Sequence, residues 1–319
     1  RIQSKDARIR LLLSLSANLK VTDWLTLQAR GNLDYSADKL RQKFYASTAT
    51  ALCGMNGRYI EMDYQETQMY GDVMAMVKKQ LNDFTLDVAI GGSINDRITN
   101  STRIDSKNAS LKYANVFNLA NIVMSSSASI DQKIDAHYQL QSVFATAQIG
   151  YKEGVFLDLT ARNDWSSTLA YTKYEKKGFF YPSVGVSFLP DKWVKMPEWV
   201  SFSKLRGAYS IVGNGVPPFI TYPVSYVTAG GEILASDAAP FAEMKPEMTH
   251  SVELGIEWKF LQHRLGLNLT YYHTDTYEQF FKLPALAGDK YAYRYVNAGD
   301  IRNQGWEITL DATPVLTPD

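Results

Sequence analysis

Cysteine is almost absent from this chain of 319 residues, and histidine is scarce. The single cysteine, Cys53, excludes an internal disulfide, and no histidine lies near it in the sequence to form a catalytic thiol pair. A lone cysteine also fits an oxidising compartment that avoids thiols. No histidine has metal-ligand spacing with another, so we expect no metal and no other cofactor. The four histidines are His137, His250, His263 and His273.

Net charge and long apolar runs are missing too. The 33 Lys and Arg residues balance 33 Asp and Glu residues, which gives no reason to expect nucleic acid or an acidic substrate. No stretch approaches the roughly 18 consecutive apolar residues of a transmembrane helix. No signal peptide begins at Arg1, and a strand pattern starts soon after it, while another ends shortly before Asp319. Both ends therefore resemble cuts through a longer fold.

Signatures of enzymes are absent as well, and we expect no enzyme. The Gly-Asn-Gly sequence at 213–215 follows a strand pattern but opens no helix, so it indicates a turn rather than a phosphate loop. No serine elbow and no His-Glu-x-x-His sequence occurs. His250 and Ser251 are adjacent, so they would point to opposite faces of a strand and could not act as a pair.

Alternation of apolar and polar residues is the main positive signal. From Phe84 the sequence FTLDVAIGGSI alternates in this way, which is the pattern of a strand with one apolar face. Helical periodicity is nearly absent, so the sequence predicts an all-β fold. We expect about eleven strands, near 8–21, 24–36, 68–81, 84–97, 138–151, 154–166, 178–189, 201–212, 248–260, 263–276 and 294–313.

Strand lengths and connections both favour a transmembrane antiparallel β-barrel. Most runs exceed the roughly 5–6 residues of a globular strand and match the roughly 9–11 of a tilted membrane-spanning strand. Outer-membrane barrels place short turns on the periplasmic side and long loops outside, whereas a soluble sandwich has no reason to sort its connections. Here short turns at 22–23, 82–83, 152–153, 190–200 and 261–262 alternate with long loops at 37–67, 98–137, 167–177, 213–247 and 277–293.

Large aromatic residues lie where membrane–water interfaces would be. Trp24 and Trp258 are beside short turns, and Tyr35, Tyr271 and Trp306 lie on outward faces nearer the long loops. Such rings favour the interface because one edge is apolar and the other polar. Each residue alone could equally be an ordinary core or cross-strand aromatic, but the set favours two aromatic girdles.

The opposite strand faces carry many charged residues. Burial of so many charges in a dry core would be very costly, whereas they are expected to face a wet or plugged barrel lumen. A sandwich with its polar face in solvent is the remaining alternative. The inward-facing set is Arg30, Asp34, Asp87, Asp158, Arg162, Arg206, Glu253, Glu257, Glu307 and Asp311.

Five segments resemble, in the same order, sequences from the C-terminal half of SusC/RagA-type TonB-dependent transporters. The resemblance is strong over 155–319 and only architectural over 1–154. The segments are LTARNDWSSTL at 159–169, FFYPSVGVSFLPDKW at 179–193, KLRGAYSIVGNG at 204–215, the predicted hairpin at 245–280, and YVNAGDIRNQGWEITLDATPV at 295–315.

This resemblance implies a Bacteroidetes-like outer-membrane importer of glycan fragments or oligopeptides. Such a protein has a 22-stranded barrel in the lipid bilayer, an internal plug, a SusD-like surface lipoprotein as lid, and TonB–ExbB–ExbD as its energy source. Residues 1–319 would then be a partial barrel domain with about half the strands and no plug, because eleven strands alone would leave open edges in lipid. Two alternatives stay open: a non-transport barrel with a structural or secretion-associated role, and a soluble β-sandwich binding module.

Two long loops, at 213–247 and 277–293, are the candidates for contact with substrate or a lid protein. Exposed aromatic rings can stack on sugar faces or anchor a partner. The alternative is that the rings pack against neighbouring loops as the core of a folded cap. The residues are Phe219, Tyr222, Tyr226 and Phe241 in the first loop, and Tyr291, Tyr293 and the adjoining Tyr295 in the second.

Overall fold

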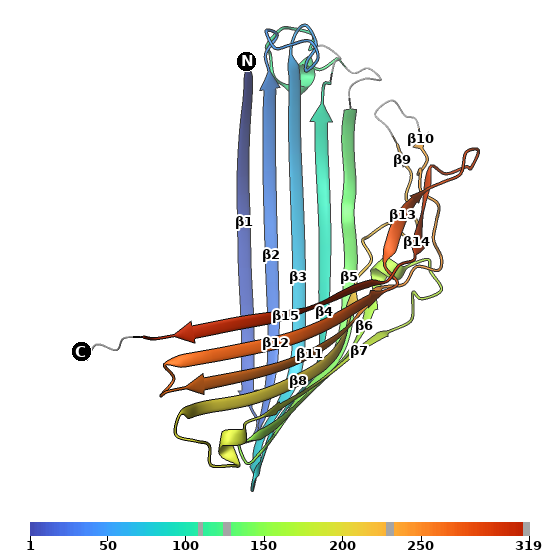
Figure 1. Cartoon of the computed structure of the whole chain (residues 1–319). Helices are drawn as coiled ribbons and strands as arrows, with labels where there is room; N and C mark the ends of the chain where they lie inside the picture. Colours follow the sequence, from blue (N-terminus) through green and yellow to red (C-terminus); the bar gives the residue numbers. More distant parts are fainter. Residues whose placement is uncertain (108–110, 124–128, 228–232, 315–319) are drawn as a thin grey trace.

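A computed structural model describes residues 1–107, 111–123, 129–227 and 233–314 and places its eleven long strands in one antiparallel sheet. Neighbours in the sheet are neighbours in the chain, apart from two short ribbons inserted in the loops (Figure 1). The strands are β1 (Ile2–Lys20), β2 (Leu25–Phe44), β3 (Arg58–Leu81), β4 (Phe84–Asp105), β5 (Ser129–Tyr151), β6 (Val155–Ser166), β7 (Phe179–Phe188), β8 (Val200–Asn214), β11 (Glu247–Phe260), β12 (Leu265–Tyr277) and β15 (Ile301–Ala312).

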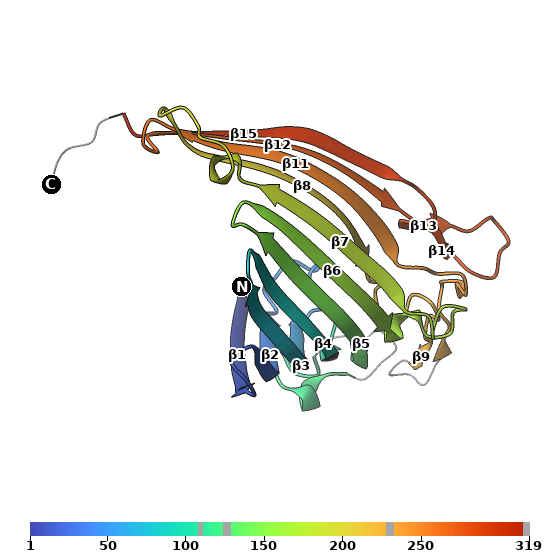
Figure 2. The same cartoon turned by 90° about the horizontal axis from the view of Figure 1, so that it is seen from below.

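The sheet is a single curved and twisted wall with β1 and β15 at its two edges (Figure 2). The inserted ribbons are β9 (Tyr226–Val227) with β10 (Ile233–Leu234), and β13 (Phe280–Pro284) with β14 (Tyr293–Asn297). The only helical segments in the described residues are three short 3-10 turns, and none is long and apolar enough to cross a membrane. The all-β prediction is confirmed, and one curved sheet excludes the two packed sheets of a β-sandwich.

The first five strands are longer than predicted. The connections expected at 37–67 and 98–137 shrink, because β2 continues to Phe44, β3 begins at Arg58, β4 continues to Asp105 and β5 begins at Ser129. The alternation of apolar and polar residues fades in these extensions, so the sequence pattern predicted loops there. Cross-strand ion pairs stabilise them instead: Lys39 Nζ lies 3.2 Å from carboxylate oxygens of both Glu61 and Asp63.

The strand predicted at 294–313 is also wrong as a single element. It is divided between β14 in a loop ribbon and β15 in the main sheet. Gly299, between them, has a φ of 115°, a conformation that favours glycine and redirects the chain. Tyr293 and Tyr295 before the break are at odd positions, whereas Trp306, Ile308 and Leu310 after it are at even positions, so the alternation changes phase across the break.

Short turns close one end of the sheet and long connections close the other, as predicted. At the turn after β5, Lys152 and Glu153 have φ values of 48° and 52°, which suit a tight hairpin turn with both central residues left-handed. At the turn after β11, Leu261, Gln262 and His263 all have positive φ. We refer below to the short-turn end and the long-loop end of the sheet.

The two faces of the sheet differ completely in chemistry. One row of opposed residues joins Leu27, Ala75, Ile90, Ala145 and Ala161 across β2 to β6. A second row joins Leu254, Tyr271 and Trp306 on the same face across β11, β12 and β15. This apolar face is open: Leu15 on β1 is 80% exposed and Trp306 is 65% exposed. A soluble protein rarely exposes a continuous apolar area of this extent.

Candidate functional site

The opposite, polar face contains every charged residue that was predicted to point inward. The strand registers place all of them on one side of the sheet, including positions on β2, β4, β6, β8, β11 and β15. These residues are Arg30, Asp34, Asp87, Asp158, Arg162, Arg206, Glu253, Glu257, Glu307 and Asp311.

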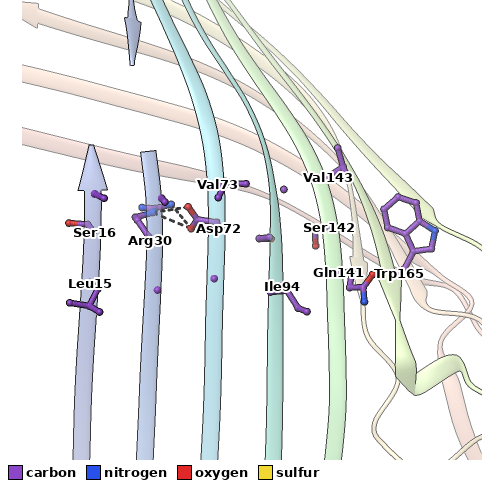
Figure 3. Close-up of a pocket in the computed structure, with 16 residues that line it drawn as sticks. Leu15, Ser16, Arg30, Asp72, Val73, Ile94, Gln141, Ser142, Val143 and Trp165 are labelled. Carbon is purple, nitrogen blue, oxygen red and sulfur yellow. Dashed lines mark hydrogen bonds and ion pairs between the residues drawn. The ribbon is translucent and has the colours of Figure 1, made fainter. Parts of the chain in front are cut away.

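Arg30 and Asp72 form an ion pair on this face at the level of the apolar rows. Figure 3 shows them joined across β2 and β3, with Trp165 of β6 further along the sheet. Arg30 Nε lies 3.1 Å from both carboxylate oxygens of Asp72, and its Nη2 lies 3.0 Å from one of them. The Asp72 side chain has no exposed surface. Because Arg30 and Asp72 lie on adjacent strands, the two charges compensate each other within the polar face.

Other arginine side chains on the polar face also donate hydrogen bonds to residues of nearby strands. Arg162 on β6 donates to Ser142 Oγ at 2.7 Å on β5 and to Asp164 Oδ1 at 2.7 Å. Arg206 on β8 donates to Thr270 Oγ1 on β12 at 2.6 Å. To reach β12 from β8 its side chain crosses β11 at Gly255, where an added Cβ would lie 2.4 Å from the Arg206 Nε. This glycine therefore provides the space for the crossing guanidinium.

A buried charge cluster lies at the long-loop end of β3 and β4. Asp105 is 1% exposed and accepts hydrogen bonds from Arg58 at 2.8 Å and from Arg103 at 2.8 Å. Burial raises the pKa of the Asp105 carboxyl, but hydrogen bonds from Arg58 and the Lys107 N–H and the charges of both arginines outweigh it, so its pKa lies below the ordinary value. Arg58 also donates to Leu52 O and Asp105 accepts from the Lys107 N–H, so the cluster holds the connections that precede β3 and follow β4.

Next to this cluster a small loop core forms. Leu111 and Ile122, from the connection between β4 and β5, pack with Tyr59, and Phe117 lies against them. Burial, and a hydrogen bond to Glu61, raise the pKa of Tyr59 to about 12. Cys53 is also buried beside this core, 1% exposed. The first group of loops therefore folds around side chains of its own.

A second loop core joins the connections after β6 and β8, and residues of the connection between β12 and β15 pack against it. Leu169, Val216 and Met244 are almost completely buried and come from the loops after β6 and β8. Two of the predicted loop aromatics, Phe241 and Tyr295, pack against this core. Tyr293 packs edge-on against Tyr295 with ring centroids 6.0 Å apart and lies beneath Lys282 Nζ at 3.5 Å. These three aromatics have the geometry of a folded cap.

The remaining predicted loop aromatics are in different surroundings. Tyr222 is 53% exposed and Phe219 is 37% exposed. Tyr291 is half-buried, with Lys290 Nζ 5.3 Å from its ring centroid. Tyr226 lies in β9, but its side chain is outside the described residues. Among these residues, Tyr222 has the most exposed side chain of those whose exposure the structure describes.

Sequence reasoning missed the partner of Tyr222. Tyr171, in the loop after β6, is 71% exposed, and its ring centroid is 5.0 Å from that of Tyr222. Thr221 Oγ1 donates to Ala170 O at 2.9 Å, which joins the two loops beside the rings. Tyr171 has a φ of 65°, which is uncommon for a bulky residue. Neither ring shows an apolar pattern in the sequence, so only the loop packing could reveal the pair.

The predicted girdle aromatics lie at the two rims of the apolar face. Tyr271 and Trp306 contact each other across β12 and β15 with centroids 4.9 Å apart. Tyr35 lies on the same face of β2, at the long-loop rim. At the short-turn end, Trp258 donates to Ser203 Oγ at 2.7 Å, and Lys79 Nζ lies 5.8 Å from the Trp24 ring.

Several short-turn aromatics were not among the predicted girdle residues. Trp193, in the connection between β7 and β8, has its ring centroid 5.5 Å from that of Tyr151, which in turn contacts Phe84 at 4.7 Å. Trp199 stacks on Phe260 with centroids 5.5 Å apart. The position of tryptophan next to predicted short turns was the signal that could have identified them. Within the described residues no group of His, Cys, Asp and Glu could hold a metal ion.

Comparison with known proteins agrees with this architecture. The family described as TonB dependent receptor-like, beta-barrel, matches residues 2–317. TonB-dependent receptors P26 and P3 of Formosa agariphila are 26% and 25% identical to this chain over 192 and 191 residues. Those matches cover 56% and 57% of this chain but only 19% of each relative, so the chain corresponds to a small part of their length.

Solved structures share the fold along the whole wall. The RagAB peptide transporter superposes with a TM-score of 0.85 at 18% identity, over 100% of this chain and 35% of that one. The ferric-catecholate import receptor Fiu from E. coli K12 gives 0.58 at 12% identity, over 97% of this chain and 45% of that one. The RagAB likeness agrees, at the level of fold, with the resemblance over 155–319. This chain belongs to the TonB dependent receptor-like β-barrel family.

Proposed function

We propose that this chain is part of the wall of a TonB-dependent importer in a bacterial outer membrane. The observation that carries the proposal is the division of all eleven strands into one exposed apolar face and one ion-paired polar face. A barrel built from such strands meets lipid with the first face and a water-filled or plugged lumen with the second.

The cargo in this proposal is a glycan fragment or an oligopeptide. The fold similarity to a structure described as a peptide transporter supports the oligopeptide class. A SusD-like lipoprotein would cover the long-loop end, and TonB–ExbB–ExbD would supply energy through a plug domain outside residues 1–319. The polar face carries paired charges and hydroxyl groups, which suit a wall that holds a plug and admits hydrated cargo.

The proposal is tested with the full-length protein in its own bacterium. Deletion of its gene should abolish growth on the limiting oligopeptide or glycan, and loss of TonB should produce the same defect. Uptake that survives the loss of TonB would contradict the proposal. The alternative, a structural or secretion-associated barrel, predicts unchanged nutrient uptake and a damaged or leaky envelope instead.

Membrane topology gives a direct test of orientation. The short turn at Gln262 should face the periplasm, and the connection at 213–247 should face outside. A single cysteine placed at Asn214 or Tyr222 should react with a membrane-impermeant thiol reagent on intact cells, whereas one at Gln262 should react only after lysis. Cys53 is first replaced by serine so that the engineered cysteine is the sole thiol. Labelling at Gln262 in intact cells would reverse the orientation.

The exposed tyrosine pair is the proposed contact for cargo or lid protein. Replacing Tyr171 and Tyr222 together by alanine should reduce uptake or lid association by about tenfold, because each stacked ring contributes roughly 0.5–1.5 kcal/mol. The matched variant replaces Tyr291 and Tyr293, of which Tyr293 packs within the cap. Assembly is checked by heat-modifiable migration in gels. Normal uptake and normal lid association in the Tyr171/Tyr222 variant would exclude the pair as a contact.

A further inference from the structure

Within the described residues, the outer part of β5 has a strand partner on one side only. The register pairs β5 with β6 from Leu140 onward, whereas its pairing with β4 begins at Ser129. Residues 130–139 therefore form an open strand edge at the long-loop end, near the ribbon of β9 and β10 (Figure 1). The registers bring Tyr35 level with His137, so this edge lies at and beyond the rim of the apolar face.

Backbone groups of this edge point away from β4 at alternate residues. In an antiparallel sheet each residue directs its N–H and C=O to the same side, and successive residues alternate. Gln139 N–H donates to Ser167 Oγ at 2.7 Å, on the β6 side. The alternation, shifted by one residue at a β-bulge in β5, assigns the same side to His137, Ile134 and Gln132. In the part of the chain that the structure describes, no hydrogen bond satisfies the outward N–H and C=O groups of these three residues.

A groove of about 330 Å³ lies along this edge. It is lined on β5 by residues 131–135, and on the other side by Phe219, Val224 and Val227 from the connection after β8. Apolar side chains in the groove are open to solvent: Ile134 is 51% exposed and Val227 is 66% exposed. Exposed apolar side chains thus border a row of unpaired backbone groups.

The charge of the groove is negative on balance. Asp131 and Asp135 line it together with a single cation, Lys133. Lys133 Nζ lies 3.3 Å from Asp135 Oδ1. The other carboxylate oxygen, Asp135 Oδ2, is buried and has no hydrogen-bond partner among the described residues. A ligand that brings a cation to this position would complete the carboxylate with a charge-assisted hydrogen bond.

We propose that the open edge of β5 binds an extended oligopeptide with basic side chains by adding it as a further strand. The peptide backbone would pair with Gln132, Ile134 and His137, and its alternate side chains would lie toward Val224 or toward Asp135. A glycan has no regularly spaced amide groups and cannot complete such a ladder, so the edge selects the oligopeptide class. The inference rests on the proposed importer, because that function makes the bound peptide a cargo.

Two features of the edge limit what can pair with it. The bulge and the charged side chains at 131–135 discourage the long, flat pairing that leads to aggregation. A short peptide is not excluded, because it needs only the few residues beside the groove.

The test measures peptide binding to the purified full-length protein by fluorescence anisotropy. The probe is a labelled octapeptide of alternating valine and lysine, which should bind. Two matched peptides should bind at least about tenfold more weakly. One has every backbone amide N-methylated, so it cannot donate to the edge, and the other carries glutamate in place of lysine.

Substitutions on β5 test the same contacts from the protein side. Gln132→Pro removes one outward N–H and keeps the pairing with β4, because proline is tolerated where the N–H faces away from the ladder. Affinity for the valine–lysine peptide should fall roughly fivefold, the effect of one hydrogen bond. Gln132→Ala keeps the N–H and should bind normally. Asp135→Asn should weaken binding severalfold, whereas Asp23→Asn at the short-turn end should not.

Equal binding of the N-methylated peptide would overturn strand addition, and this result does not depend on the assembly of any variant. Equal binding of the glutamate peptide would overturn the preference for basic side chains. Normal affinity in a Gln132→Pro variant with unchanged heat-modifiable migration would also contradict the inference. The transport function is tested separately by uptake in the gene deletion, so unchanged uptake there would reject the importer without rejecting the peptide-binding edge.

Discussion

Leu269→Arg is expected to destabilise the barrel by about 2–4 kcal/mol, because it places a guanidinium on the apolar face near the middle of the lipid layer. Leu269 is opposite Ile256 and Ile308 in the registers with β11 and β15. The structure places Leu267 opposite Trp258, one pair nearer the short turn, so Leu267→Arg should cost less.

Asn268→Arg provides the matched control. Asn268 lies between Leu267 and Leu269 in the sequence, but its side chain is on the opposite, polar face of the sheet. It is opposite Glu257, which can pair with the new charge, so we expect a change below about 1 kcal/mol. Unfolding of the full-length protein by urea in lipid vesicles, followed by tryptophan fluorescence, gives the three values. Equal losses at Asn268 and Leu269 would show that the faces of this hairpin are wrongly assigned.

Asp105→Asn should produce the second large effect, a loss of about 2–3 kcal/mol in the stability of the loops that pack around Tyr59, Leu111 and Ile122. Removing the carboxylate leaves Arg58 and Arg103 without their shared partner. The positive charges of the two arginines are then uncompensated, which is costly for a buried ion pair. This loss is at or below the roughly 3–5 kcal/mol typical of breaking a buried ion pair, because Arg58 keeps 23% of its side chain exposed. Limited proteolysis of the connection between β2 and β3 measures the opening.

Acid should imitate this substitution in the unaltered protein. The pKa of Asp105 is lower in the folded chain than in the unfolded chain, so its contribution is complete above the ordinary carboxyl pKa and is lost as pH falls through the lower, folded value. Cleavage of the unaltered protein by an acid-tolerant protease should therefore rise below about pH 4, whereas the Asp105→Asn variant should lack this transition. Asp23→Asn, at a 99% exposed side chain, is the control and should behave like the unaltered protein.

The sequence was sufficient wherever one physical constraint acts along a whole strand. Lipid on one side and a wet lumen on the other impose strict alternation, so the number of strands, the order of short and long connections and the facing of Arg30, Arg162 or Glu253 followed from periodicity. The place of Tyr271 and Trp306 on the apolar face followed for the same reason, and the next pair of that row toward the long loops, His273 and Gln304, is polar. Their role as membrane-interface residues stays a prediction.

The tertiary structure decided what lies beyond the membrane level, where this constraint ends. Both faces of a strand are polar there, so Lys39, Glu61 and Asp63 gave no alternation, and their cross-strand ion pairs alone reveal that β2 and β3 continue. In the loops, contacts between residues far apart in sequence determine burial. They place Tyr293 in a packed cap and leave Tyr171 and Tyr222 exposed together, because nonlocal packing leaves no periodic signal in a sequence.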